Sequence, residues 1–150
     1  FASATRVGSI ITNKENKIKD ALEFYGKNLG LTFQIADDTL DYNSELKLFG
    51  KEIGNDFYEG KVTLPIILLY QKLKINEKKE LKELFEKNIR SKEEFLEVIS
   101  MIKKYNIIFE CYKKAEHFIN LASNSLSIFE DSKEKNILQN LTSFSLERAF

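Results

Sequence analysis

Apolar residues recur at intervals of three and four along almost all of this 150-residue sequence, which contains a single proline, Pro65. That spacing places apolar side chains on one face of an α-helix, and the alternating runs typical of half-buried strands do not occur. Because one proline leaves long helices possible, the sequence predicts an all-α fold. With 43% hydrophobic residues, residues 1–150 suit one ordinary domain or part of one.

The pattern also predicts where helices begin. Ser91 followed by Glu94 has the spacing of a capping box, in which each side chain satisfies an unpaired backbone N–H group. Asp131 and Glu134 repeat that spacing. Pro65 suits the first turn of a helix, where its missing N–H costs nothing. We expect helices over residues 1–11, 16–42, 64–74, 77–88, 92–104, 106–128 and 132–148.

The charge balance excludes one class of partner. Lysine and arginine together number 23, as do aspartate and glutamate, so the net charge is zero and no nucleic-acid partner is expected. No apolar run approaches the roughly 20 residues that cross a bilayer, so we expect no transmembrane segment. The one cysteine, Cys111, has no partner for an internal disulfide, which favours a reducing compartment such as the cytoplasm.

Three acidic side chains gather near the end of the second predicted helix, in the sequence FQIADDTLDY at 33–42. At about 100° per residue, with Gln34 at zero, Asp37, Asp38 and Asp41 fall at about −60°, +40° and −20° on one helix face. Clustered carboxylates repel unless a cation lies between them, and such oxygen ligands suit Mg²⁺ with substrate phosphates. On its own, the pattern also fits a solvated acidic helix face.

A stretch punctuated by glycines follows, FGKEIGNDFYEGKVTLP at 49–65. The polar segment 42–63 is longer than most connections in a compact domain, and loops of that length are usually functional. Lys51 and Lys61 lie on it, where two cations would complement a diphosphate bridged to the carboxylates by metal. Either lysine alone is typical of a solvated surface, but their fixed spacing with the acidic motif favours a shared site.

These two stretches resemble the second aspartate-rich region of trans-isoprenyl diphosphate synthases. The EGKVTLP ending is most similar to the long-chain polyprenyl, octaprenyl-type branch, which makes quinone side chains. Upstream, YGKNLG at 25–30 resembles the family's YGxxLG. The resemblance covers the whole chain, but it is looser at 129–132 and 146–148 and highly specific over 25–65 alone.

The resemblance implies helices that surround a central cavity, a homodimer and a requirement for Mg²⁺. By position, Asp37 and Asp41 would hold the Mg²⁺ that bridges to an allylic diphosphate, and Asp38 would complete the acidic cluster. Lys51 and Lys61 would contact the diphosphate oxygens.

The same resemblance places Gln34 opposite the reacting carbon, where its amide oxygen would stabilise developing positive charge. The implied reaction ionises the allylic diphosphate, adds the carbocation to the double bond of isopentenyl diphosphate and removes a proton. Metal and lysines would act by stabilising the leaving diphosphate.

Other parts of the family pattern do not occur in residues 1–150: a first aspartate-rich motif, basic residues that bind isopentenyl diphosphate and a Lys-Thr pair expected just before Phe1. We therefore expect the C-terminal half of a polyprenyl synthase, either as a fragment or as one half of a split enzyme that needs a complementing N-terminal half. A non-catalytic helical subunit that binds prenyl diphosphate or a partner synthase is an alternative. A class I terpene cyclase fits the lysine loop and the TLP ending less well than chain elongation does.

Overall fold

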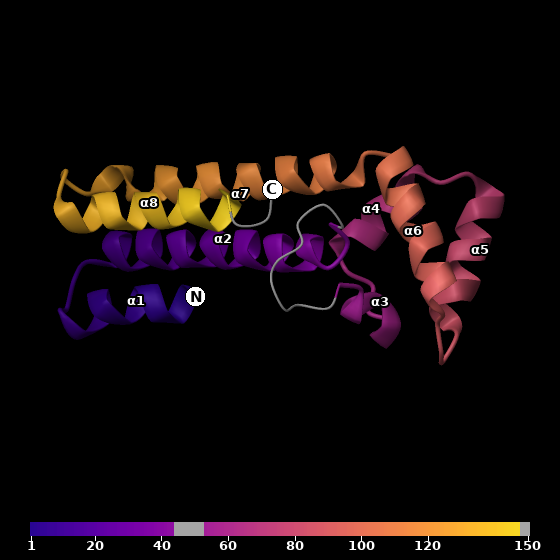
Figure 1. Cartoon of the computed structure of the whole chain (residues 1–150). Coiled ribbons are helices and arrows are strands. Elements are labelled where there is room, and N and C mark those ends of the chain that lie inside the picture. The colour runs from indigo at the N-terminus through magenta and orange to yellow at the C-terminus, as the bar shows by residue number, and fades with distance from the viewer. Residues whose placement is uncertain (44–52, 148–150) are drawn as a thin grey trace. The chain divides into compact units, whose positions relative to one another are not determined.

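The computed structural model describes residues 1–43 and 53–147, and over these ranges every regular element is a helix (Figure 1). The elements in chain order are α1 (Ala2–Ile11), α2 (Asn16–Leu40), α3 (Asn55–Glu59), α4 (Leu64–Lys72), α5 (Ile75–Glu86), α6 (Lys92–Lys104), α7 (Ile107–Ser125), the 3₁₀ helix η1 (Leu126–Ile128) and α8 (Lys133–Glu147). The all-α prediction is confirmed. Within the described ranges, no helix is both long enough and apolar enough to cross a bilayer.

Two helix starts are as the sequence predicts. Before α6, Ser91 Oγ accepts the N–H of Glu94 at 3.2 Å, and the Glu94 carboxylate accepts the N–H of Ser91 at 2.7 Å. This is the capping box, and it satisfies two amides that have no partner within the helix. Thr63 occupies the cap position of α4, and Pro65 lies in its first turn.

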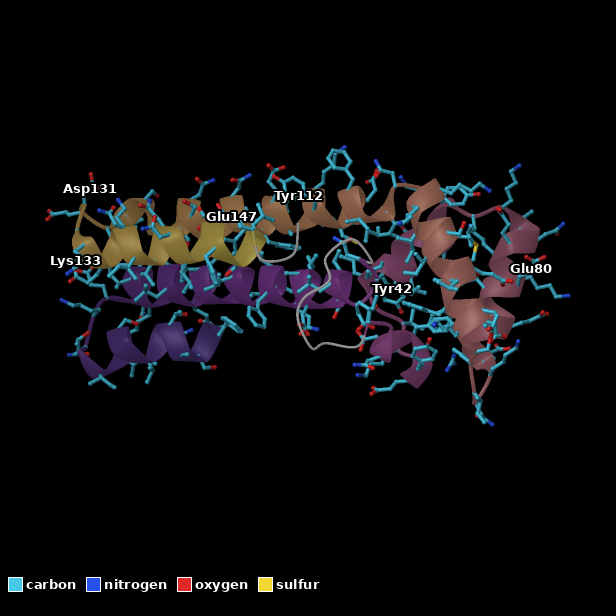
Figure 2. All side chains as sticks on the ribbon, in the orientation of Figure 1. Tyr42, Glu80, Tyr112, Asp131, Lys133 and Glu147 are labelled. Carbon is cyan, nitrogen blue, oxygen red and sulfur yellow. The ribbon has the colours of Figure 1, made fainter. Side chains whose placement is uncertain are left out.

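The start of α8 differs from the prediction. The capping side chain is Ser132, whose Oγ accepts the N–H of Lys135 at 3.1 Å. Asp131 instead forms an ion pair with Lys135 Nζ at 2.9 Å. Asp131 and Lys133 lie at this turn (Figure 2). The capping box predicted from Asp131 is therefore wrong by one residue, because a serine directly before the helix takes its place.

Other helix boundaries differ from the prediction, and one helix was missed. The helix predicted over 16–42 ends at Leu40, and the N–H of Tyr42 donates to Thr39 O at 3.1 Å in a turn (Figure 2). The helix predicted over 106–128 ends at Ser125 and tightens into η1. The segment 42–63, predicted to be a loop, contains α3.

The described residues fall into two compact units. The first comprises residues 1–36 and those from 112 onwards, and the second lies within 37–111. In the first unit, a core is formed by Tyr25, Leu29, Ala122 and Leu126. The Tyr25 hydroxyl donates to Leu138 O at 2.8 Å, and burial raises the pKa of Tyr25 to about 12.

Gly26, the glycine that follows Tyr25 in the YGKNLG stretch, lets α1 approach α2 closely. A Cβ atom on Gly26 would overlap Thr5 Oγ1 and lie 2.9 Å from Phe1 O. The Thr5 hydroxyl also donates to Leu22 O at 2.6 Å, which fixes the two helices together. Gly30 faces the side chain of Phe1 in the same way. Both glycines therefore serve packing in the first unit.

The second unit contains a cluster of five aromatic rings, which we call the aromatic cluster. Its members are Tyr42, Phe57, Tyr58, Phe85 and Phe95. Phe57 is fully buried, and its ring centroid lies 5.4 Å from that of Phe95 and 5.7 Å from that of Phe85. Aromatic rings contribute large buried areas and favour such tilted and edge-on arrangements. The cluster therefore anchors the short helix α3 to α5 and α6.

Candidate functional site

The acidic motif lies where α2 ends. Asp37 and Asp38 are on the last turns of the helix, and each is half-buried. Gln34 is exposed and belongs to the first unit, whereas the three aspartates belong to the second. The shared role of Gln34 and these carboxylates stays a prediction.

Asp41 lies just beyond α2 and caps another helix. It is 4% exposed, its Oδ2 accepts the N–H of Asp56 at 2.7 Å, and its backbone carbonyl accepts the N–H of Gly54 at 3.0 Å. Burial raises the pKa of the Asp41 carboxyl above its ordinary value. Hydrogen bonds from the N–H groups of Asp56, Asn55 and Gly54 offset part of that rise. The carboxylate thus satisfies amides at the start of α3 that have no partner within the helix.

Glycines bound α3 at both ends. Gly54 at the N-cap has φ +94° and Gly60 at the C-cap has φ +74°. These are left-handed backbone conformations that residues with a side chain rarely adopt. Sequence reasoning missed this helix, although the two glycines of GNDFYEG were a readable signal for its ends. They turn the chain sharply before and after α3, so that Lys61 follows the helix directly.

Lys61 is held by acidic side chains of the same segment. Its Nζ lies 2.6 Å from Glu59 Oε2 and 3.2 Å from Asp56 Oδ1, and its side chain is 56% exposed. Hydrogen bonding to Glu59 and then to Asp56 raises the pKa of Lys61. The ammonium is therefore charged at neutral pH, and it is near enough to solvent to bind an anion.

Asp56 joins the two sequence motifs. Its N–H donates to Asp41, its carboxylate accepts from Lys61 Nζ, and its carbonyl accepts the N–H of Lys61 at 2.8 Å. Asp56 and Glu59 were not among the predicted site residues, because neither belongs to the acidic motif. The structure therefore brings Asp41 and Lys61 into one hydrogen-bonded network. Lys51 lies outside the described residues.

The acidic side chains near the end of α2 are the predicted ligands of Mg²⁺. Over residues 1–43 and 53–147, no group of three or more histidine, cysteine, aspartate or glutamate side chains is arranged to hold a metal ion. The Asp41 carboxylate is engaged with α3, whereas Asp37 and Asp38 are half-buried carboxylates on neighbouring positions. Mg²⁺ usually takes one or two carboxylates together with substrate phosphates, so it does not need three converging side chains, and the chemistry of these carboxylates fits it. Metal binding by Asp37, Asp38 and Asp41 stays a prediction.

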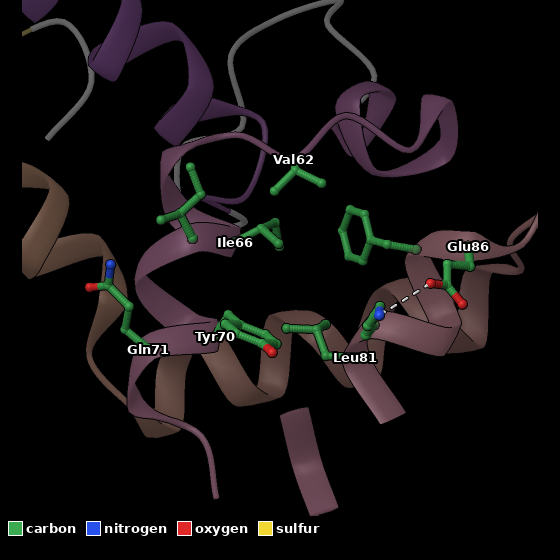
Figure 3. A pocket seen from close by; sticks show the side chains of 9 residues that line it. Val62, Ile66, Tyr70, Gln71, Leu81 and Glu86 are labelled. Carbon is green, nitrogen blue, oxygen red and sulfur yellow. Dashed lines mark ion pairs between the residues drawn. The ribbon is translucent and has the colours of Figure 1, made fainter. Parts of the chain in front are cut away.

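A pocket in the second unit has a different character (Figure 3). It encloses about 600 Å³ and is lined mainly by apolar side chains, including Val62, Ile66, Tyr70 and Leu81, from the segment after Lys61, α4 and α5. Its two charged side chains, Lys82 and Glu86, pair with each other at 3.7 Å. It therefore offers little to bind a diphosphate, and the candidate site remains at the end of α2 and around α3.

Comparison with known proteins decides the family. Residues 1–102 match the sequence profile of polyprenyl synthetases. The chain belongs to the polyprenyl synthetase family. The sequence-based assignment to trans-isoprenyl diphosphate synthases is thereby confirmed, and it was carried by the acidic and lysine stretches that the geometry links.

Relatives within the polyprenyl synthetase family include enzymes of differing product length. The chain is 32% identical to an all-trans-nonaprenyl-diphosphate synthase (geranyl-diphosphate specific) of Rhodobacter capsulatus, over 99% of this chain and 45% of that protein. It is 27% identical to the octaprenyl diphosphate synthase of Haemophilus influenzae, over 100% of this chain and 45% of that protein. The chain thus spans less than half the length of these relatives.

Solved structures of the family share the fold. A decaprenyl diphosphate synthase from Rhodobacter capsulatus superposes with a TM-score of 0.91 at 29% identity, covering 100% of this chain and 46% of that one. A polyprenyl synthase from Caulobacter crescentus, complexed with calcium and isoprenyl diphosphate, superposes with a TM-score of 0.90, again at 29% identity and with 100% and 46% coverage. The helices described above are therefore those of the isoprenoid synthase fold.

Proposed function

We propose that this chain is the C-terminal half of a prenyltransferase that elongates an allylic diphosphate with isopentenyl diphosphate to a polyprenyl diphosphate. The observation that carries the proposal is the link, through Asp56, between the acidic end of α2 and Lys61. Diphosphate binding requires carboxylates that can hold a divalent cation together with a charged lysine, and these are the groups that the two motifs supply. The names of the relatives support the same reaction class.

Asp37 and Asp41 would hold Mg²⁺, which when bound neutralises charge on the leaving diphosphate. The Caulobacter crescentus structure, which is complexed with calcium and isoprenyl diphosphate, supports a site that takes a divalent cation and a diphosphate. Asp38 would complete the acidic cluster, and the present contact of Asp41 with Asp56 holds the start of α3 at the end of α2.

Lys61 would donate hydrogen bonds to the diphosphate oxygens. To do so, its ammonium exchanges the carboxylates of Glu59 and Asp56 for phosphate oxygens, which carry more negative charge. Lys51 would contribute a second cation, and the Gln34 amide oxygen would face the developing carbocation. Donors fixed in place where charge develops lower the barrier to ionisation.

The complete protein is proposed to act as a homodimer or as a chain completed by a complementing N-terminal half. The single cysteine, Cys111, which has no partner for an internal disulfide, fits the cytoplasm as its location. Products for quinone side chains are proposed from the EGKVTLP ending.

Residues 1–150 alone are expected to be inactive. Ionisation in this reaction needs metal held from two sides, and the chain carries one aspartate-rich motif and spans 45% of its relatives. The purified chain incubated with Mg²⁺, isopentenyl diphosphate and an allylic diphosphate should give no longer prenyl product, whereas an enzyme containing both motifs should. Sustained turnover by the chain alone would contradict this expectation. Substrate binding without turnover by the two-motif enzyme would favour the non-catalytic subunit instead.

Lys51→Ala in the complete enzyme should weaken binding of the allylic diphosphate more than binding of isopentenyl diphosphate. The reason is that the family pattern assigns isopentenyl diphosphate to basic residues outside this chain. Separate titrations with the two substrates measure the difference, and Lys74→Ala, at the exposed cap of α5, is the matched control. Equal weakening of both substrates by Lys51→Ala would remove the assignment.

A further inference from the structure

Arg90 is a buried cation in the connection between α5 and α6. It is 9% exposed. Its guanidinium donates hydrogen bonds to three backbone carbonyls, those of Leu84 at 3.2 Å, Phe85 at 2.5 Å and Tyr58 at 3.2 Å. Two of these carbonyls lie near the end of α5, and the third lies near the end of α3. One side chain therefore joins the C-terminal ends of two helices that are distant in sequence.

The same guanidinium packs against Gly60. A Cβ atom on Gly60 would lie 2.6 Å from Arg90 Nη2 and 3.0 Å from Cζ, so only a glycine permits this approach. Gly60 has φ +74°, and its N–H donates to Phe57 O at 3.0 Å. The backbone that leads into Lys61 is thus fixed between α3 and Arg90.

The chemistry of the contact requires arginine. The last carbonyls of a helix have no partner within it, and the planar guanidinium presents five N–H donors in a fixed fork. A lysine ammonium is a single point of charge and does not span carbonyls on two separate helices. Burial of the Arg90 charge is compensated by these hydrogen bonds and by the face of the Phe85 ring, 5.4 Å away.

We propose that Arg90 is a positioning residue for Lys61, an inference that rests on the proposed function. Asp41 holds the N-terminal end of α3, and Arg90 holds its C-terminal end. The N–H of Lys61 is bonded to Asp56 within α3, so any shift of α3 moves Lys61 with it. Arg90 itself touches no substrate. It fixes the point from which the lysine reaches the diphosphate.

The test is a double-mutant cycle on the complete enzyme, with Mg²⁺ and inorganic diphosphate as the probe. Arg90→Met keeps the length of the side chain and removes its donors, and it should weaken diphosphate binding about five- to tenfold. In a Lys61→Ala background the same change should alter affinity less than twofold, because there is no lysine left to misplace. Equal losses with and without Lys61 would overturn the proposal.

Arg6→Met is the matched control. Arg6 is an arginine of the first unit that pairs with Glu23 on the protein surface, so its loss should leave diphosphate affinity within about twofold. If Arg90→Met does not fold, Arg90→Lys takes its place. Arg90→Lys keeps the positive charge but lacks the forked N–H donors of the guanidinium. It should lose less diphosphate affinity than Arg90→Met, and that loss should again depend on the presence of Lys61.

Hydrogen exchange supplies a readout that is independent of ligand binding. The amides of Gly60 and Lys61 should exchange faster in Arg90→Met, while those of Leu68 and Leu69 in α4 stay protected. Uniformly faster exchange, or no change at Gly60 and Lys61, would overturn the positioning role. If the wild-type enzyme bound no diphosphate, the proposed function would be wrong, and exchange at these two amides alone would decide whether Arg90 fixes α3.

Discussion

Asp37→Asn should lower the rate of chain elongation by the complete enzyme about 10²- to 10³-fold, or roughly 3–4 kcal/mol. The substitution keeps the shape of the side chain and removes its charge, so the helix should survive while attraction for Mg²⁺ falls. If the pull of a bound metal on the leaving diphosphate grows as the bond breaks, the loss should appear mainly in the transition state. If Asp37 were one residue of a solvated acidic face, the rate would scarcely change.

Rate measurements across a range of Mg²⁺ concentrations test this expectation. Higher Mg²⁺ should recover part of the loss, and circular dichroism should show that the variant stays helical. The control is Glu130→Gln, an exposed acid of the first unit, which should leave the rate within about twofold. A folded Asp37→Asn enzyme with unaltered rate and Mg²⁺ dependence would remove Asp37 from the site.

The features predicted well from sequence were those whose signal is local. The capping box of Ser91 and Glu94 lies within four residues, and Pro65 marks the first turn of α4 by itself. Such signals act through backbone amides of the same helix, so they need no knowledge of the tertiary structure. The helical spacing of apolar residues gave the fold class for the same reason.

The acidic motif lies near the end of a long helix, as the sequence predicts, but the environment of Asp41 was not predicted. The 100° rotation per residue holds only inside a helix, and α2 ends at Leu40. Beyond that point the chain turns, and the Asp41 carboxylate finds the N–H of Asp56, 15 residues away. Helix propensity and residue spacing carry no information on such a hydrogen bond, because tertiary packing determines which residue lies next to Asp41.

The buried position of Arg90 was not predicted for the same physical reason, and here the sequence separation between the partners is larger. The partner carbonyl of Tyr58 is 32 residues away, and nothing around Arg90 in the sequence distinguishes it from a surface arginine. Its burial follows from the glycine at position 60, which leaves room for the guanidinium. Positioning residues of this kind become visible only when the backbone they hold has been placed.

Phe57→Ala should lower the free energy of unfolding by about 3–5 kcal/mol, the cost of truncating a large buried aromatic side chain. Phe57 is fully buried, and its ring contacts those of Tyr58, Phe85 and Phe95. Truncation leaves a cavity at the centre of the aromatic cluster. Because that cluster anchors α3, the loss should be accompanied by faster hydrogen exchange of the amides of α3.

Urea denaturation followed by circular dichroism measures the change in unfolding free energy. Phe144→Ala is the matched control: the side chain on α8 is 62% exposed, so its truncation should cost under ~0.5 kcal/mol. Phe57→Leu refills much of the cavity and should restore a large part of the stability, since apolar swaps of similar volume are tolerated best. If Phe57→Ala cost no more than Phe144→Ala, α3 would not be held by the aromatic cluster, and Asp41 and Arg90 alone would have to fix Lys61.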